Sequence, residues 1–348
     1  MRALTVIPGV PNSARLQDLP KRPPEAGELL VRTLAVGVCG TDREIVGGHY
    51  GWAPAGHERL ILGHESLGRV EEAPPNSGFE PGDLVTGIVR RPDPVPCRYC
   101  AAGEWDMCAN GLYTERGIKE LDGFCSDFFR IEPEFAVKLD PGLGLPGVLV
   151  EPASVVAKAW DHADRIGGRS RAWAPETLLV TGAGPVGLLA ALLGAQRGLQ
   201  VFVMDRVTSG PKPDLVRDLG GTYYAGSLPE DFAPDVVMEC TGAASVIVEV
   251  INRTAASGIV CLAGISSGEH RIGVDIDLLN RTMVLENDAI FGSVNANRSH
   301  YEAAAEALAK ADSTWISRLI TRRVPPEEWE DALARHPDDV KVVIDFTL

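Results

Sequence analysis

Four side chains suited to binding a zinc ion lie far apart in the 348-residue sequence. Cys39 begins the run Cys-Gly-Thr-Asp, His64 and Glu65 follow a glycine, and Glu151 precedes a proline. Together they offer one thiolate, one imidazole and two carboxylates, all of which zinc accepts. A catalytic zinc ion needs about three protein ligands and an open position for water or substrate. The sequence therefore predicts a catalytic zinc site formed by Cys39, His64, Glu65 and Glu151.

Such a site is suited to the oxidation of an alcohol. Zinc stabilises an alkoxide near neutral pH, and an alkoxide can release hydride to a nicotinamide held beside it. Thr41 lies two residues after Cys39, and its hydroxyl can take the proton and pass it outward through the coenzyme ribose. We predict Thr41, Glu65 and Glu151 as the catalytic residues.

A dinucleotide-binding fingerprint, Gly-Ala-Gly-Pro-Val-Gly, follows a predicted strand at 177–180 and opens a predicted helix at 185–199. In this pattern the first glycine permits a tight turn, the second lets the backbone approach the pyrophosphate, and the third lets helix and strand pack closely. The free N–H groups at the helix N-terminus then bind the phosphates. The predicted coenzyme-binding residues are Gly182, Gly184, Pro185, Val186 and Gly187.

The end of the next predicted strand, 201–205, bears on the choice of coenzyme. Asp205 can accept hydrogen bonds from both hydroxyls of the adenosine ribose and would repel a 2′-phosphate, which favours NAD. Arg206 is adjacent and can pair with that phosphate. The sequence favours NAD and leaves the use of NADP open.

The elements that must position these residues are of two kinds. Before residue 90, short predicted strands at 28–36, 67–72 and 84–89 with frequent turns indicate a compact β-barrel. The proline-rich stretch 90–108 has no periodicity and is predicted to be a loop or a lobe.

From residue 175 onward the pattern changes, because predicted strands alternate with helices such as 244–254. This alternation is typical of a doubly wound parallel sheet. The chain ends with a predicted helix at 300–311 and a tail that is too short to be a domain, so we expect it to pack onto the N-terminal part. The predicted strands of the sheet are 177–180, 201–205, 235–240, 259–264 and 289–294.

Composition excludes some classes of function. The net charge is −15, which argues against non-specific binding to nucleic acid or to an anionic membrane. Hydrophobic residues make up 45% of the chain, as in a globular protein with substantial cores. The N-terminal segment has no apolar core like that of a signal peptide, and no apolar run approaches a membrane span. We therefore expect a cytoplasmic protein with a small-molecule substrate.

The order of these motifs resembles the zinc-containing, medium-chain alcohol dehydrogenase superfamily over nearly the whole chain. The resemblance implies an α/β protein with an active site in the cleft between two domains. It also implies a homo-oligomer, either a dimer or a tetramer. The implied parts are a GroES-like β-barrel catalytic domain over 1–165, a Rossmann dinucleotide-binding domain over 166–295, and a C-terminal segment over 296–348 that returns to the catalytic domain.

Within the superfamily the motifs are most similar to the glucose 1-dehydrogenase branch. The similar runs are 39–46, 62–65, 90–91, 115–118 and 292–295. In that branch zinc is held by the residues that match Cys39, His64 and Glu65, with the match of Glu151 acting directly or through water. The branch surrounds its sugar with the residues that match Thr41, Glu115, Glu151 and Asn295.

The resemblance thus implies oxidation of the C1 hydroxyl of D-glucose to gluconolactone. The sorbitol and threonine dehydrogenase branch also has a Glu-Pro at this place, which leaves another polyol or an amino alcohol as the alternative. Two further classes share the fold: a zinc-free quinone or enoyl reductase, and a non-catalytic nucleotide-sensing protein. The four candidate zinc ligands argue against the first, and Thr41 beside a candidate ligand argues against the second.

A cluster of cysteines resembles the structural zinc lobe of the superfamily, which normally carries four cysteines. Cys97, Cys100 and Cys108 match the last three, whereas the first falls on Pro94, which cannot bind metal. Asp93 is adjacent, and its carboxylate could replace the missing thiolate. Three free thiolates on a loop would be prone to oxidation, which favours a second zinc ion bound by Asp93, Cys97, Cys100 and Cys108.

Overall fold

The computed structural model describes residues 1–21, 23–266 and 272–348. These residues form two compact units. The first unit comprises Met1–Ser154 and Asn295–Leu348, and the second comprises Val155–Val294. The units divide inside helix α3 (Val150–Gly167), whereas the sequence placed the boundary near the end of this helix, at residue 165.

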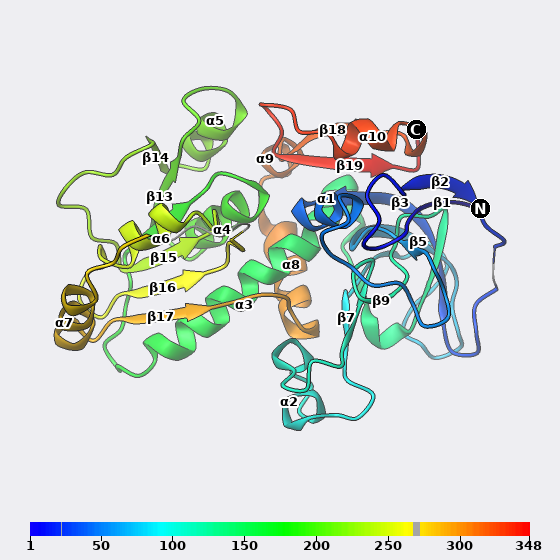
Figure 1. Ribbon diagram of the computed structural model, residues 1–348, viewed down its shortest axis with the longest axis horizontal. Helices are drawn as coiled ribbons and strands as arrows, with labels where there is room; N and C mark the ends of the chain where they lie inside the picture. Colours follow the sequence, from blue (N-terminus) through cyan, green and yellow to red (C-terminus); the bar gives the residue numbers. More distant parts are fainter. Residues whose placement is uncertain (22, 267–271) are drawn as a thin grey trace. The chain divides into compact units, whose positions relative to one another are not determined.

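A seven-stranded sheet forms the body of the first unit (Figure 1). Its order is β11-β6-β5-β3-β19-β18, and β10 also pairs with β3. Strand β19 belongs to the C-terminal segment and pairs antiparallel with β3, which builds the tail of the chain into this sheet. The strands are β3 (Leu29–Val38), β5 (Glu65–Glu72), β6 (Leu84–Gly87), β10 (Phe128–Ile131), β11 (Ala136–Lys138), β18 (Ile320–Val324) and β19 (Lys341–Asp345).

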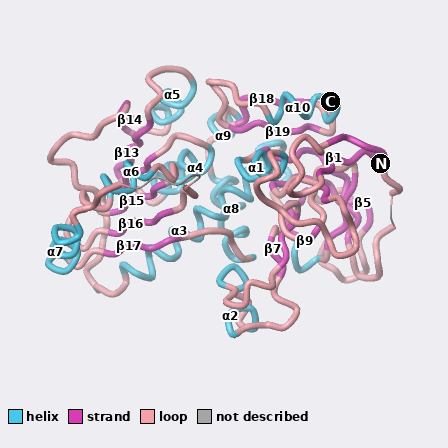
Figure 2. The backbone as a smooth tube through the Cα atoms, viewed as in Figure 1, coloured by secondary structure: helices cyan, strands magenta, loops and turns pink. Residues whose placement is uncertain are grey.

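Two three-stranded sheets and short helices complete the first unit (Figure 2). One sheet has the order β2-β1-β4, with strands β1 (Arg2–Val6), β2 (Arg15–Asp18) and β4 (Leu60–Ile61). The other has the order β7-β8-β9, with strands β7 (Arg90–Arg91), β8 (Thr114–Arg116) and β9 (Glu120–Leu121). The α-helices are α1 (Gly40–Val46), α2 (Arg98–Ala101), α8 (Arg298–Lys310), α9 (Ser313–Ser317) and α10 (Trp329–Leu333).

The second unit is a six-stranded parallel sheet with the order β14-β13-β12-β15-β16-β17. The strand order reverses between β12 and β15, and a doubly wound sheet binds its ligand at the carboxyl ends of the strands at such a point. Buried apolar side chains hold the sheet to its helices. The strands are β12 (Thr177–Thr181), β13 (Gln200–Asp205), β14 (Thr222–Ala225), β15 (Val236–Glu239), β16 (Ile259–Leu262) and β17 (Ala289–Gly292). The helices are α4 (Pro185–Gln196), α5 (Pro211–Asp218), α6 (Ala244–Val250) and α7 (Ile276–Glu286).

The five strands predicted for the parallel sheet are all present, but several helices differ from prediction. Helix α4 ends at Gln196 rather than at residue 199, because Gly198 adopts a φ of 81° that ends the helix. The stretch 90–108, predicted to be a loop or a lobe, contains the short elements β7 and α2. Helix α3 was not predicted; Pro152 lies in its first turn, where the missing N–H of a proline has no intrahelical partner.

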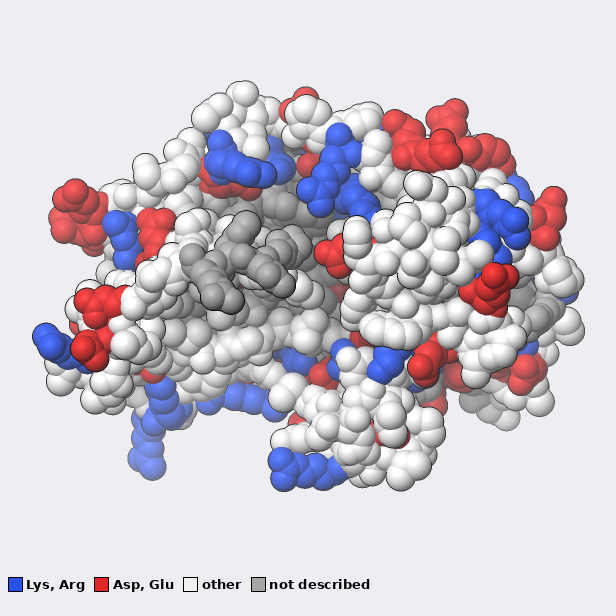
Figure 3. All heavy atoms as spheres, viewed as in Figure 1, with Lys and Arg blue, Asp and Glu red and all other residues white. Residues whose placement is uncertain are grey.

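Charged side chains of both signs are interspersed on the face drawn in Figure 3. This agrees with a net negative charge that is spread over the chain rather than gathered in one run. Among the described residues, no helix combines the length and the apolar character that a membrane crossing requires.

Candidate functional site

Cys39 and His64 come together where β3 ends and β5 begins. Cys39 is the N-cap of α1, where its Sγ accepts a hydrogen bond from the Thr41 backbone N–H at 3.3 Å. Strand β5 pairs with β3, and this brings Cys39 Sγ to 3.0 Å from His64 Nε2. The potential ligand atoms of Cys39, His64 and Glu65 all lie within 4.8 Å of one another. The structure thus assembles three of the four predicted zinc ligands.

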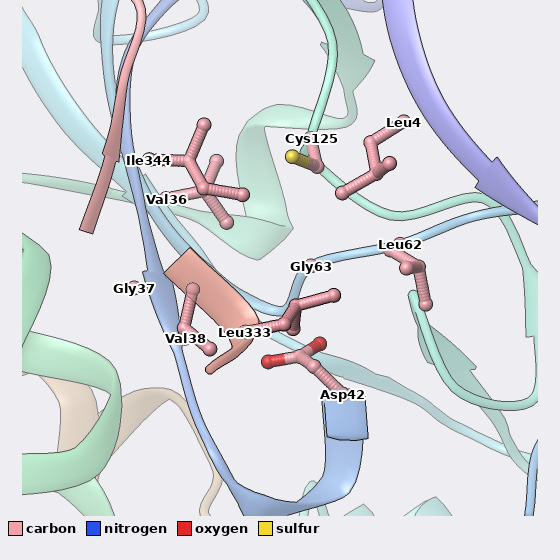
Figure 4. Close-up of a pocket in the computed structure, with 10 residues that line it drawn as sticks. All are labelled: Leu4, Val36, Gly37, Val38, Asp42, Leu62, Gly63, Cys125, Leu333 and Ile344. Carbon is pink, nitrogen blue, oxygen red and sulfur yellow. The ribbon is translucent and has the colours of Figure 1, made fainter. Parts of the chain in front are cut away.

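Asp42 orients both Cys39 and His64. Its Oδ2 accepts a hydrogen bond from the Cys39 backbone N–H at 2.9 Å, and its Oδ1 lies 3.4 Å from His64 Nδ1. Burial would raise the pKa of Asp42, but the neighbouring His64 lowers it below its ordinary value. Figure 4 shows the Asp42 carboxyl beside a small, mainly apolar cavity with Gly63 and Cys125 among its lining residues. A carboxylate on the far nitrogen of an imidazole fixes the ring for metal binding.

The electrostatics of this cluster favour a cation. Burial would lower the pKa of His64, but the charges of Cys39 and Asp42 raise it well above its ordinary value. The anionic groups around His64 therefore stabilise a positive charge at this place. A divalent cation bound to the same donors would supply that charge. The thiolate, imidazole and carboxylate thus fit a zinc ion by type, by proximity and by charge.

Lys341 completes the cluster and was missed by the sequence analysis. Its Nζ lies 2.6 Å and 2.5 Å from the two carboxylate oxygens of Glu65 and also donates to the Val38 backbone oxygen at 3.2 Å. Only 2% of Lys341 is exposed. The one signal in the sequence was a lysine at the start of the otherwise mainly apolar β19.

The backbone of β3 leaves room for the Glu65 carboxylate only because residue 37 is a glycine. A Cβ atom at Gly37 would lie 1.9 Å from Glu65 Oε2. Glu65 faces Gly37 across the β3–β5 pairing, so the strand register itself fixes this contact. The carboxylate is held between Gly37 and Lys341.

Glu151 lies near this cluster at the start of α3 but is not one of its three close members. Burial raises the pKa of Glu151 to about 7; the charge of His64 opposes this shift, and that of Glu65 adds to it. Glu151 therefore lies close enough to the candidate zinc ligands for their charges to change its pKa. Whether it binds the metal directly or through water remains a prediction.

The residues matched to sugar contacts form a second polar group. Glu115 Oε1 accepts hydrogen bonds from Asn295 Nδ2 at 2.7 Å and from Arg90 Nε and Nη2 at 3.0 Å each. Asn295 adopts a φ of 62°, a backbone conformation that asparagine tolerates better than most residues. A Cβ at Gly117, just after β8, would lie 2.5 Å from the Gly63 backbone oxygen, so this group lies beside the loop that carries His64.

The glycine loop of the second unit has the geometry that the fingerprint predicts. Gly182 adopts a φ of 92°, and a Cβ at Gly187 would lie 1.8 Å from the Gly182 backbone oxygen. A Cβ at Gly184 would meet no heavy atom within 4 Å, which leaves its backbone open to an incoming pyrophosphate. Pro185 and Val186 open helix α4, whose N-cap is Gly184. These residues fit a bound dinucleotide.

Asp205 ends β13 beside the same loop. Its Oδ2 accepts a hydrogen bond from the Ala183 backbone N–H at 2.6 Å, and its Oδ1 accepts one from the Val207 backbone N–H at 3.1 Å. Arg206 is exposed. The structure thus presents both the carboxylate that suits a ribose and the guanidinium that suits a 2′-phosphate.

Two alanine substitutions should separate packing from coenzyme binding in this loop. Gly187→Ala should lower the free energy of unfolding by about 3 kcal/mol or more, because its Cβ would overlap the Gly182 oxygen. Gly184→Ala should leave stability within about 1 kcal/mol and weaken coenzyme binding, because its Cβ occupies the approach of the pyrophosphate. Urea unfolding and NADPH titration of both variants measure this, and equal losses of stability would contradict it.

The cysteine cluster is assembled around α2. The sulfurs of Cys97, Cys100 and Cys108 lie within 4.8 Å of one another. Hydrogen bonds to the Cys97 sulfur lower the pKa of Cys97 to about 6; the largest contribution comes from the Ala109 backbone N–H, 3.4 Å from Sγ, and a further one from the Cys100 N–H. Asp93 is not among these close members, but it is buried, and its Oδ2 has no hydrogen-bond partner among the described residues.

Comparisons with known proteins agree with this geometry. Residues 25–141 match the family model described as alcohol dehydrogenase GroES-like domain. Residues 145–346 match the model described as glucose dehydrogenase C-terminus. Together the two models cover both units of the structure.

Relatives of known name resemble the chain over its whole length. A glucose 1-dehydrogenase from Methanocella arvoryzae is 38% identical over 99% of both chains, and glucose 1-dehydrogenase 2 from Vulcanisaeta moutnovskia is 39% identical over 99% of both. A solved structure of Haloferax mediterranei glucose dehydrogenase, in complex with NADP, Zn and gluconolactone, superposes with a TM-score of 0.91 at 32% identity over 100% of both chains. The chain therefore belongs to the glucose dehydrogenase branch of the zinc-dependent, medium-chain alcohol dehydrogenase superfamily.

Proposed function

We propose that this protein is a zinc-dependent aldose dehydrogenase that oxidises the C1 hydroxyl of D-glucose to gluconolactone with a nicotinamide coenzyme. The observation that carries the proposal is that the potential ligand atoms of Cys39, His64 and Glu65 lie within 4.8 Å of one another, where strand β3 ends and its partner β5 begins. The named relatives and the Haloferax complex support the choice of substrate.

Each residue of the site has a task in this proposal. Cys39, His64 and Glu65 hold zinc, which when bound lowers the pKa of a sugar hydroxyl. The Thr41 hydroxyl would accept the proton of the sugar hydroxyl and pass its own proton outward through the coenzyme ribose. Thr41 stands at the N-terminus of α1, and its backbone N–H contacts Cys39 Sγ. Glu151, at the start of α3, would act beside these ligands, either directly on the zinc ion or through water.

The Glu115 group would recognise the sugar. Asn295 and Arg90 both donate to Glu115 Oε1, so the carboxylate is fixed and keeps Oε2 for a sugar hydroxyl. A polyol binds well only where several hydrogen-bonding side chains replace its water. This group and Thr41 provide such side chains within the first unit.

Removal of Asn295 should impair sugar binding more than turnover. In Asn295→Ala, KM for D-glucose should rise about tenfold or more, because a hydrogen bond to a charged group is lost and Glu115 is less fixed. The coenzyme KM should stay within about twofold, since the glycine loop lies in the other unit. Steady-state reduction of the coenzyme with D-glucose and with sorbitol tests both statements. An unchanged KM for D-glucose, or a higher rate with sorbitol than with D-glucose in the unaltered protein, would contradict the proposal.

We propose NAD as the favoured coenzyme, with NADP also accepted. The Asp205 carboxylate at the end of β13 supports binding of an unmodified ribose, and exposed Arg206 supports pairing with a 2′-phosphate. The Haloferax relative was solved with NADP. The ratio of kcat/KM for the two coenzymes measures the preference.

We also propose a second, structural zinc ion in the cysteine cluster. The closeness of three sulfurs supports it, and buried Asp93 with a free Oδ2 supports a fourth ligand. The purified protein should contain about two zinc ions per chain, and Cys108→Ala should contain about one while keeping the kcat of the unaltered protein. About one zinc ion per chain in both proteins would contradict the proposal.

A homo-oligomer and a cytoplasmic location complete the proposal. Strand β17 is at the edge of its sheet, and helix α7 exposes apolar side chains, with Ile276 66% and Leu285 73% exposed. Such an edge and patch suit contact with a second copy. Light scattering should give at least about twice the 37.2 kDa chain mass, and the mass of one chain would contradict it. All seven cysteines are free thiols, which suits a reducing compartment.

A further inference from the structure

Glu239 is a fully buried carboxylate that the proposed chemistry leaves without a task. It ends β15, with 0% of the residue exposed. Burial of a charged carboxylate is costly unless hydrogen bonds satisfy it. Its partners therefore show what it holds in place.

The partners of Glu239 lie in the turn that follows β15. Its Oε1 accepts the Thr241 backbone N–H at 2.7 Å and also the Thr241 hydroxyl, and its Oε2 accepts the Gly242 backbone N–H at 3.1 Å. The Thr181 hydroxyl, at the end of β12, reaches Oε1 at 3.3 Å. One carboxylate thus joins the carboxyl ends of two neighbouring strands and fixes the turn between β15 and α6.

This turn packs directly on the glycine loop. A Cβ at Gly182 would lie 2.9 Å from Thr241 Cγ2, and a Cβ at Gly264 would lie 2.2 Å from the Gly242 backbone nitrogen. The Glu239 backbone oxygen accepts hydrogen bonds from Ala263 and Gly264, both at 2.8 Å. Three chain segments that follow β12, β15 and β16 therefore meet around Glu239 without space between them.

The location is the point where the strand order of the sheet reverses. Strands β12 and β15 are neighbours in space, with Thr181 opposite Glu239, although β13 and β14 lie between them in sequence. Dinucleotides bind across the crevice at this point. Asp205, at the end of β13, marks the adenosine side, so the turn held by Glu239 lies towards the nicotinamide side.

We propose that Glu239 is a positioning residue of the coenzyme site. It holds the Thr241–Gly242 turn against Gly182, so that this part of the coenzyme crevice is already formed before the dinucleotide binds. Because the turn is already ordered, dinucleotide binding loses less conformational entropy and is therefore tighter. The inference rests on the coenzyme part of the proposed function and not on the choice of sugar.

The chain offers a matched control at the opposite end of the same strand pair. Asp235 Oδ2 accepts hydrogen bonds from the Glu176 and Thr177 backbone N–H groups at 2.8 Å and 2.9 Å and from the Thr177 hydroxyl at 2.8 Å. It thus joins the amino ends of β12 and β15 as Glu239 joins their carboxyl ends. Loss of either carboxylate weakens the sheet, but only Glu239 lies at the coenzyme crevice.

The test is direct titration of NADPH into the zinc-containing protein without sugar, followed by nucleotide fluorescence. Glu239→Gln keeps the shape but places an N–H₂ group against a donor, so Kd for NADPH should rise about tenfold or more. Thr241→Val, which removes only the hydroxyl, should weaken NADPH binding in the same direction. Asp235→Asn should lower Tm yet keep Kd within about twofold. In Glu239→Gln, KM for the coenzyme should rise while KM for D-glucose stays within about twofold.

Several outcomes decide the matter. An unchanged Kd in Glu239→Gln, or an equal rise in Asp235→Asn, would overturn the inference, because the carboxylate would then act only on stability. If Glu239→Gln does not fold, an unchanged Kd in Thr241→Val overturns it and a raised Kd supports it. A protein in which these variants behave as expected, but which does not oxidise D-glucose, would contradict the proposed substrate and leave the role of Glu239 intact.

Discussion

Replacement of Cys39 by alanine should lower kcat for sugar oxidation by about a thousandfold or more and remove the catalytic zinc ion. The thiolate is the one soft ligand of the cluster, and its Sγ lies 3.0 Å from His64 Nε2. A metal ion contributes several kcal/mol of transition-state stabilisation, and each 1.36 kcal/mol corresponds to about tenfold in rate. Metal analysis and steady-state kinetics on the same preparation measure both effects.

The matched control is another buried thiol of the same unit. Cys125 lines the small cavity beside Asp42 and is 1% exposed, but it is not a member of the ligand cluster. Burial raises the pKa of this thiol above its ordinary value, so it is a neutral packing group. Cys125→Ala should keep the zinc content and keep kcat within about threefold. Equal losses in both variants would mean that Cys39 acts through packing.

Replacement of Lys341 by methionine should destabilise the metal-depleted protein by about 3 to 5 kcal/mol. The Lys341 ammonium pairs with both oxygens of Glu65, and both side chains are almost wholly buried. Removal of one partner of a buried pair leaves an uncompensated charge in a medium of low polarity. Urea unfolding in the presence of a chelator measures the loss.

An exposed ion pair of the same types provides the comparison. Lys138 Nζ lies 2.6 Å from Asp83 Oδ2, but the Lys138 side chain is 46% exposed. Lys138→Met should therefore cost less than about 1 kcal/mol. If Lys341→Met is no more destabilising than Lys138→Met, then Lys341 does not balance the charge of Glu65.

The parts of the site that depend on local sequence could be predicted. The turn of the glycine fingerprint depends on neighbouring residues only. The spacing of the glycines was therefore enough to predict the close approach of Gly187 to the Gly182 oxygen. Five of the six parallel strands were also predictable, because a sheet covered on both faces needs short apolar runs. Strand β14 (Thr222–Ala225) was missed; it lies at the sheet edge and has no fully buried residue. Cys39, His64 and Glu65 were identified by residue type and by the resemblance of their motifs.

Contacts between distant parts of the chain could not be predicted in the same way. Lys341 and Glu65 are 276 residues apart, and only the pairing of β19 with β3, next to β5, brings them together. The same holds for Asn295 and Glu115, which are 180 residues apart. Helix α3, whose first turn contains Pro152, was not predicted either.

The most direct test of the zinc site is the anomalous diffraction of a crystal measured at the zinc absorption edge. A peak is expected at bonding distance from Cys39 Sγ and His64 Nε2, about 2.3 Å and about 2.0 Å respectively, with a Glu65 oxygen close by. A crystal of protein that oxidises D-glucose but shows no anomalous peak at these three side chains would contradict the assignment of Cys39, His64 and Glu65 as the catalytic zinc ligands.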